Sequence, residues 1–307
     1  MRPLVAAMPW VAAAGAFFML PDYLPLLSAV AIAALFALSL DIIVGYAGVV
    51  TLGQAAFFGF GAYTAGILAQ QGWGEPVSGL LLAMLAAAAL GLVTAPLVLR
   101  SGDLAGLMVT LGISLMLYEA ANKAAFLTGG ADGLQGVEVW PVFGIWSFDL
   151  YGRTAYLYSL AVLFVLFLLA RLIVASPFGL SLRGIRGNAV RAAALGVPVR
   201  LRLGAAYVLA AAYAGAAGAV LAQTTQFVSL DALSFQRSAE GLLMLVLGGF
   251  GSLTGALLGA TAFTIAHSVL SEASPQFWQF WLGIALVALA LAGRGGLMGL
   301  VRRVIRR

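Results

Sequence analysis

The sequence predicts an all-α fold: a polytopic integral membrane bundle of about ten transmembrane helices with interrupted glycine-rich segments. Of the 307 residues, 63% are hydrophobic and only 9% are charged, and the mean hydropathy is +1.06. A water-soluble fold does not need so much apolar surface. The apolar runs lack the polar alternation of membrane β-strands, so they are expected to be helices, which satisfy their backbone hydrogen bonds internally.

The apolar windows give the expected crossings in chain order. Several of them reach the roughly 20 residues that cross a bilayer core. The windows are 5–20, 24–45, 51–70, 77–99, 104–124, 155–175, 203–222, 239–250, 253–270 and 277–293. Because they fill the chain, we expect residues 1–307 to form a single transmembrane domain without a soluble domain.

The first window has some features of a secretory signal. One basic residue, Arg2, precedes the apolar stretch 5–20. A second apolar stretch follows directly after the turn at 21–25. A retained first helix is therefore favoured over a cleaved signal.

Basic residues gather in the loops on one side of the expected bundle. The 176–202 loop holds five arginines and the segment after 293 holds five more, whereas the opposite loops hold only Arg153 and Arg237. Since basic residues favour the cytoplasmic side, both termini and the 176–202 loop are expected there. The net charge of +5 is explained by this topology, and nucleic acid is not expected as a partner.

The sequence offers little material for catalysis or metal binding. Cysteine is absent and His267 is the single histidine, so disulfides and multi-histidine or cysteine metal sites cannot form. No pair of nucleophile and base has convincing spacing, and no cofactor motif is recognisable. We therefore expect neither an enzyme nor a chain-bound metal or cofactor.

Two glycine-dense segments, 45–61 and 247–259, depart from plain spanning helices. One lies in each half of the chain, which is typical of interrupted helices in transporters with internal repeats. Close helix packing is the alternative, because Gly251, Gly255 and Gly259 repeat every four residues. The candidates for lining a translocation path are Gly48, Thr51, Gln54, Phe58, Gly248 and Gly249.

The segment 176–198 separates two spanning windows. Pro177 and Gly179 are expected to end the preceding helix, and a short amphipathic helix over 182–195 would then carry arginines on its surface. Gly196 followed by Pro198 is a typical helix end. Such a helix can rest on anionic lipid, or it can be a docking helix that a soluble subunit grips.

Several segments together resemble one family. Residues 40–48 (LDIIVGYAG), 51–63 (TLGQAAFFGFGAY), 127–134 (LTGGADGL), 183–196 and 240–259 occur in this order. They resemble the inner-membrane permeases of ABC importers for branched-chain amino acids, specifically the M-type of the two paired permeases. The resemblance extends from about residue 35 to residue 293.

The resemblance implies a permease subunit of an ATP-driven importer in the bacterial inner membrane. The implied partners are a second homologous permease, two ABC ATPase subunits, a periplasmic solute-binding protein and membrane lipid. The substrate would be a branched-chain amino acid or a related small solute. The chain has no G-x-x-x-x-G-K-[ST] phosphate loop, so ATP would be used by the partner subunits.

The resemblance also implies that the 176–202 loop couples this chain to the ATPases. The coupling candidates are Arg183, Gly184, Arg186, Asn188, Ala192, Ala193, Leu195 and Gly196. Family members often have histidine at the position of Gln54 and asparagine at that of Asp41. They usually have acidic residues around Gly187 in the coupling helix, whereas the charged residues of this helix in the present chain are all basic. Docking would then depend on apolar contacts and on arginines paired with acidic ATPase residues.

A self-sufficient secondary transporter or channel for a small polar solute is the rival function. The sparse charges within the spans disfavour proton or sodium coupling, but they leave passive conduction open.

Overall fold

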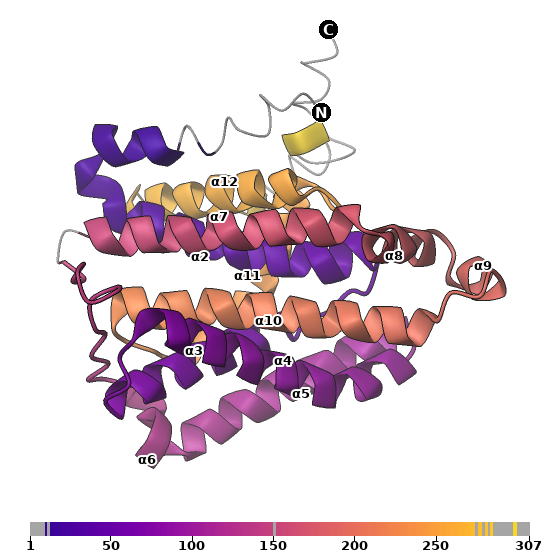
Figure 1. Cartoon of the computed structure of the whole chain (residues 1–307), viewed down its shortest axis with the longest axis horizontal. Coiled ribbons are helices and arrows are strands. Elements are labelled where there is room, and N and C mark those ends of the chain that lie inside the picture. The colour runs from indigo at the N-terminus through magenta and orange to yellow at the C-terminus, as the bar shows by residue number, and fades with distance from the viewer. Residues whose placement is uncertain are drawn as a thin grey trace, which may run out of the picture.

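The chain folds into a bundle of helices that run mostly along one axis (Figure 1). The computed structural model describes residues 10, 13–149, 152–273, 276–277, 280–281, 283–284 and 297–299. Its α-helices are α2 (Leu24–Leu40), α3 (Gln54–Gln70), α4 (Pro76–Arg100), α5 (Asp103–Lys123), α6 (Ala125–Thr128), α7 (Arg153–Ala175), α8 (Pro177–Gly187), α9 (Ala189–Ala194), α10 (Val199–Thr225), α11 (Phe235–Gly248) and α12 (Leu253–Ala273). The short elements are the 3₁₀ helices η1 (Pro21–Tyr23), η3 (Gly130–Asp132) and η4 (Leu230–Leu233) and the π-helix η2 (Asp41–Tyr46).

Within the described residues, six helical segments are long and apolar enough to cross a membrane. They are Pro21–Tyr46, Pro76–Arg100, Leu104–Lys123, Arg153–Ala175, Val199–Thr225 and Leu253–Ala273. The expected windows 51–70 and 239–250 form α3 and α11, which have only 17 and 14 residues. Much of window 5–20 and most of 277–293 lie outside the described residues. The helical membrane class is thus confirmed, but the described part does not support a count of about ten crossings.

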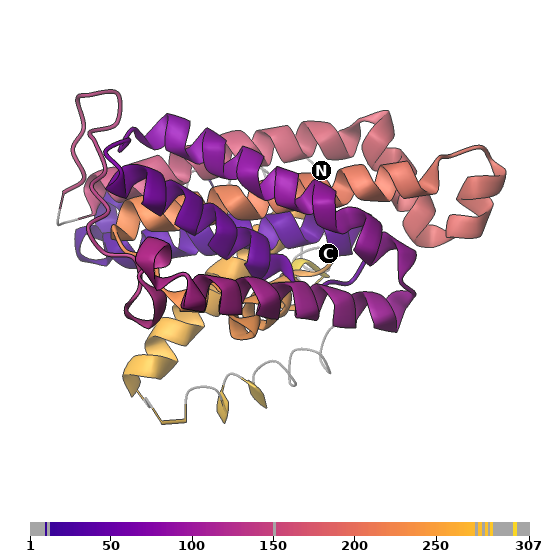
Figure 2. The same ribbon diagram turned by 90° about the horizontal axis from the view of Figure 1, so that it is seen from below.

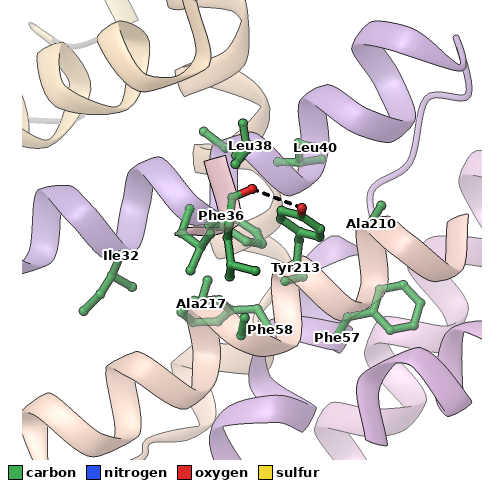
Figure 3. Packing of buried hydrophobic residues seen from close by; sticks show 14 of the residues in the cluster. Ile32, Phe36, Leu38, Leu40, Phe57, Phe58, Ala210, Tyr213 and Ala217 are labelled. Carbon is green, nitrogen blue, oxygen red and sulfur yellow. Dashed lines mark hydrogen bonds between the residues drawn. The ribbon is translucent and has the colours of Figure 1, made fainter. Parts of the chain in front are cut away.

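Helix α10 lies at the centre of the bundle and contacts α2, α3 and α4. Small residues allow this approach, because a methyl group at Gly218 would overlap the backbone of Phe58 and one at Gly215 would overlap α4. Beside these contacts, Phe36, Phe58 and Tyr213 are buried in a closely packed apolar core (Figure 3). The middle of the bundle is therefore filled by this chain's own side chains.

The two ends of the bundle carry different elements (Figures 1 and 2). One end carries α8 and α9 with their arginines. The opposite end carries α6, the segment 133–149 and the turn 71–75 between α3 and α4. Trp73, in this turn, and Trp140 and Trp146, in the segment 133–149, are exposed. Exposed tryptophans are typical of a membrane–water interface. The basic and aromatic ends thus lie at opposite ends of the spanning helices.

Candidate functional site

The arginine-rich segment forms two helices, which corrects the prediction of one helix over 182–195. Helix α8 begins directly at Pro177, and the chain breaks at Asn188, whose extended backbone has φ −165° and ψ 103°. The Asn188 side chain accepts a hydrogen bond from the Arg191 N–H at 2.8 Å and so caps α9. Helix α9 ends at Ala194, and Gly196, which has φ +84°, follows the C-cap Leu195 at the position where the sequence predicted the helix end.

Helix α8 is anchored in the bundle while α9 projects from it. Leu182 and Ile185 of α8 are buried on its inner face, and α8 contacts α7, α10 and η2. On and after α9, Val190 and Leu195 are 81% and 79% exposed. An apolar groove of about 570 Å³ lies between α9 and the start of α10. An exposed apolar surface with Arg200 at its edge is suited to holding a partner protein.

The predicted coupling residues divide between these two surfaces. Arg183 and Arg186 reach from α8 toward the bundle, and the Arg183 guanidinium lies 5.1 Å from the centre of the Tyr46 ring. Ala192 is buried, whereas Gly184, Asn188, Ala193, Leu195 and Gly196 are exposed. Their coupling role stays a prediction.

Arg186 links α8 to the first interrupted segment. Its Nη1 atom donates a hydrogen bond to the carbonyl of Gly45, in the last turn of η2, where carbonyls lack intrahelical partners. The stem of the same side chain lies over Gly48, which has φ +79°. A methyl group at Gly48 would lie 2.9 Å from Arg186 Cγ. Displacement of Arg186 would therefore disturb the end of η2.

Asp41 links the first interrupted segment to the second. Its Oδ1 atom accepts a hydrogen bond from the N–H of Gly251 at 2.7 Å, and its side chain is fully buried. Gly251 has φ +74° and lies in the turn 249–252 between α11 and α12. Gly45, in the first glycine-dense segment, also lies against Gly251, so the two glycine-dense segments meet at this point.

The glycines of the second segment serve both of the predicted purposes. Gly248 lies against Gly255, and a methyl group at Gly259 would overlap the backbone of Met244, so packing brings α11 and α12 together. Gly249 has φ +98° and forms the turn with Gly251. Interruption and close packing therefore occur in the same segment.

The other path candidates are buried within this subunit. The Gln54 side chain donates hydrogen bonds to Ser39 Oγ at 3.2 Å and to the Ala210 carbonyl at 3.0 Å. Thr51 is fully buried, and its hydroxyl accepts from the Gly53 N–H at 3.2 Å. Phe58 packs against Phe36 with ring centres 5.0 Å apart. A role for these residues in lining a path stays a prediction.

Helices α3 and α11 both begin beside the middle of α5. Thr110 and Ser114 lie about 10 and 16 Å along α5 at 1.5 Å per residue. Thr110 accepts from the Leu52 N–H at 3.2 Å, just before α3, and Ser114 donates to the Leu233 carbonyl at 3.3 Å, just before α11. The two helix starts are also joined, because Ser238 accepts from the Ala55 N–H at 2.9 Å. Since α5 is itself long and apolar enough to cross a membrane, both helices are expected to start within the membrane and not at its surface.

Sequence reasoning missed a charged pair at this depth. It placed Arg237 in an outer loop, but the residue lies in the first turn of α11, with its guanidinium 5.9 Å from the centre of the Phe58 ring. Arg237 Nη1 lies 3.4 Å from Glu240 Oε2. The spacing of three residues between opposite charges could have indicated the pair. The position of the pair along the bundle could not be predicted from this spacing, because it depends on how the chain folds.

Among the described residues, no group of three or more histidine, cysteine or acidic side chains could hold a metal ion. The structure instead has an arginine-rich end, at α8 and α9, that is linked to the interrupted helices. Together with six helices long and apolar enough to cross a membrane among the described residues, this arrangement defines a class, the multi-pass membrane proteins.

Comparison with known proteins places the chain within that class. A model of the branched-chain amino acid transport system permease component family matches residues 23–291, so the chain belongs to this family. It is 29% identical over 296 residues to the high-affinity branched-chain amino acid transport system permease protein LivM of Escherichia coli strain K12, covering 87% of this chain and 68% of LivM. LivM of Salmonella typhimurium strain LT2 is 28% identical over 292 residues with the same coverage. No solved structure matches the chain.

The resemblance inferred from the sequence motifs is thereby confirmed. Membership makes the chain a multi-pass inner-membrane transport subunit. A permease component works with other subunits of its transport system.

The Asp41 contact can be tested with a matched pair of variants. Asp41→Ala leaves the buried Gly251 N–H without its acceptor, and we expect a loss of about 1–3 kcal/mol in the free energy of unfolding. Asp41→Asn keeps an oxygen acceptor and should preserve stability. Thermal unfolding of the detergent-purified protein measures both. Equal destabilisation by the two variants would contradict the hydrogen-bonding role.

Proposed function

We propose that this chain is the transmembrane permease subunit of an ATP-driven importer for branched-chain amino acids. The observation that carries the proposal is the position of Arg186, which reaches from the exposed basic end to Gly45 and lies close to Gly251. The substrate class is supported by the two relatives, which are both named as high-affinity branched-chain amino acid permeases.

The coupling mechanism follows from this arrangement. A partner ATPase would hold the exposed surface of α9 through Val190, Leu195 and the arginines around them. Movement of α8 on ATP binding would then shift Arg186, and with it η2 and the turn 249–252. These two segments end α2 and join α11 to α12, so a small shift of α8 would change how the helices of the path pack.

The complete transporter would contain a second homologous permease, two ABC ATPase subunits and a periplasmic binding protein that delivers the substrate. This chain would bind no cofactor, because ATP is used by the partner subunits. Both termini would lie in the cytoplasm. A count of about ten crossings requires α3 and α11 as partial spans together with windows 5–20 and 277–293.

Reconstitution tests the proposal against a self-sufficient transporter or channel. The chain is purified alone and, in parallel, together with the permease, ATPase and binding-protein subunits of its system. Only proteoliposomes with the full complex should take up radiolabelled leucine, and only with ATP. Uptake by the chain alone would show that the importer-subunit proposal is wrong.

Arg186→Gln tests the coupling mechanism in the same complex. Loss of the Arg186 contact should lower uptake per ATP hydrolysed by roughly 2- to 30-fold, while the ATPases still co-purify. Arg100→Gln is the matched control, because Arg100 is exposed at the same end, at the last residue of α4, and lies outside the groove beside α9. If both variants retain wild-type uptake per ATP, Arg186 does not transmit the movement.

The absence of cysteine allows a direct test of orientation and docking. Val190→Cys should react with a membrane-impermeant maleimide only from the cytoplasmic side, and bound ATPase subunits should protect it. Glu138→Cys, which is exposed near the opposite end, should react only from outside and without protection. Labelling of Val190→Cys from outside would overturn the orientation.

A further inference from the structure

Arg237 and Glu240 form a charged pair at the depth where α3 and α11 begin. Besides the 3.4 Å contact between them, Gln236 donates a hydrogen bond to the second Glu240 carboxylate oxygen at 3.2 Å. The next residue along α11 from Arg237 is Ser238, which binds the start of α3. Ionisable side chains are costly at this depth, and those that persist there mark substrate pathways.

The pair is not enclosed by this subunit. The Arg237 side chain is 37% exposed and that of Glu240 is 17% exposed. The neighbouring helix α5 is also largely exposed along its length. Charged groups cannot face hydrocarbon without a large cost, so this side of α11 must face water in a path or another protein chain.

We propose that this pair is the binding site for the amino-acid backbone of the transported substrate, with Arg237 holding the carboxylate and Glu240 holding the ammonium group. The inference rests on the proposed function, from which it takes the substrate class. A free α-amino acid carries one negative and one positive group on adjacent atoms, and the pair offers the matching charges. The planar guanidinium can hold a carboxylate through two parallel hydrogen bonds.

The surroundings fit a branched apolar side chain. Leu243 and Leu247 follow Glu240 on the same face of α11 at spacings of three and four residues, and both are partly exposed. The Phe58 ring lies beneath the Arg237 guanidinium and restrains its position. The site therefore combines the oppositely charged pair with the apolar side chains of Leu243 and Leu247.

A purely structural ion pair is the competing explanation. Such a pair would be needed for folding or assembly, and its loss would not depend on the charges of the substrate. Substrate analogues that each lack one charge separate the two explanations, because only a binding site is sensitive to which charge is missing.

The experiment uses the purified complex of the two permeases and the ATPases without the binding protein, which would itself bind leucine. It measures binding of tritiated leucine, competed by 4-methylpentanoate, which lacks the ammonium group, or by 3-methylbutylamine, which lacks the carboxylate. Glu240→Gln should weaken leucine and 3-methylbutylamine binding by about tenfold or more and leave 4-methylpentanoate unchanged. Arg237→Gln should weaken leucine and 4-methylpentanoate binding and leave 3-methylbutylamine unchanged. Glu272→Gln and Arg171→Gln, which remove exposed charges near the ends of the spanning helices α12 and α7, are the matched controls.

Thermal unfolding and subunit co-purification are measured for every variant, with Glu240→Asp and Arg237→Lys as conservative replacements should either glutamine variant fail to assemble. If the wild-type complex transports leucine and the pair variants bind all three ligands like the controls, this inference is wrong and the proposed function stands. Equal weakening of all three ligands also overturns it, since that result indicates a structural pair. If the wild-type complex fails to transport leucine, the proposed function itself is wrong.

Discussion

The structure depends on one constraint: backbone N–H and C=O groups inside a bilayer must find partners within the protein. Regular helices meet it on their own, but the chain leaves the helical conformation at 47–53 and at 249–252. At these places side chains supply the hydrogen-bond partners of the backbone groups. Asp41 accepts from the Gly251 N–H and Arg186 donates to the Gly45 carbonyl, so each interruption is stabilised by a residue from another element.

The same constraint explains the two helices that are expected to begin within the membrane. The first turn of a helix has four N–H groups without intrahelical partners. Ser234 accepts from the Arg237 N–H at 3.2 Å at the start of α11, and Ser238 accepts from α3. These hydroxyls make it possible to start a helix inside the membrane. They also fix α3 and α11 to each other, which keeps Arg237 beside Phe58.

Hydropathy and glycine content predicted much of this architecture. Apolar windows located the long helices because twenty apolar residues have few stable alternatives in a membrane, and glycine density located both interruptions. The meeting of these two interruptions was not predictable, because Asp41 and Gly251 are joined only by the packing of α2 against α11 and α12. The break at Asn188 was missed because a capping side chain competes with a continuous arginine-bearing helix.

Arg237 shows why a local pattern cannot settle a site. A short window beginning at residue 239 excluded Arg237 from the membrane, since a charged residue lowers the hydropathy of any window that contains it. The fold returns the chain from the end of α10 to the middle of α5 before α11 begins, and this return carries the arginine inward. A partly exposed charge at that depth is costly beside lipid, so this face of α11 is expected to border water or another protein chain. This face of α11, inside the membrane, is therefore a second place besides the basic helices where the permease component would meet a substrate path or another subunit.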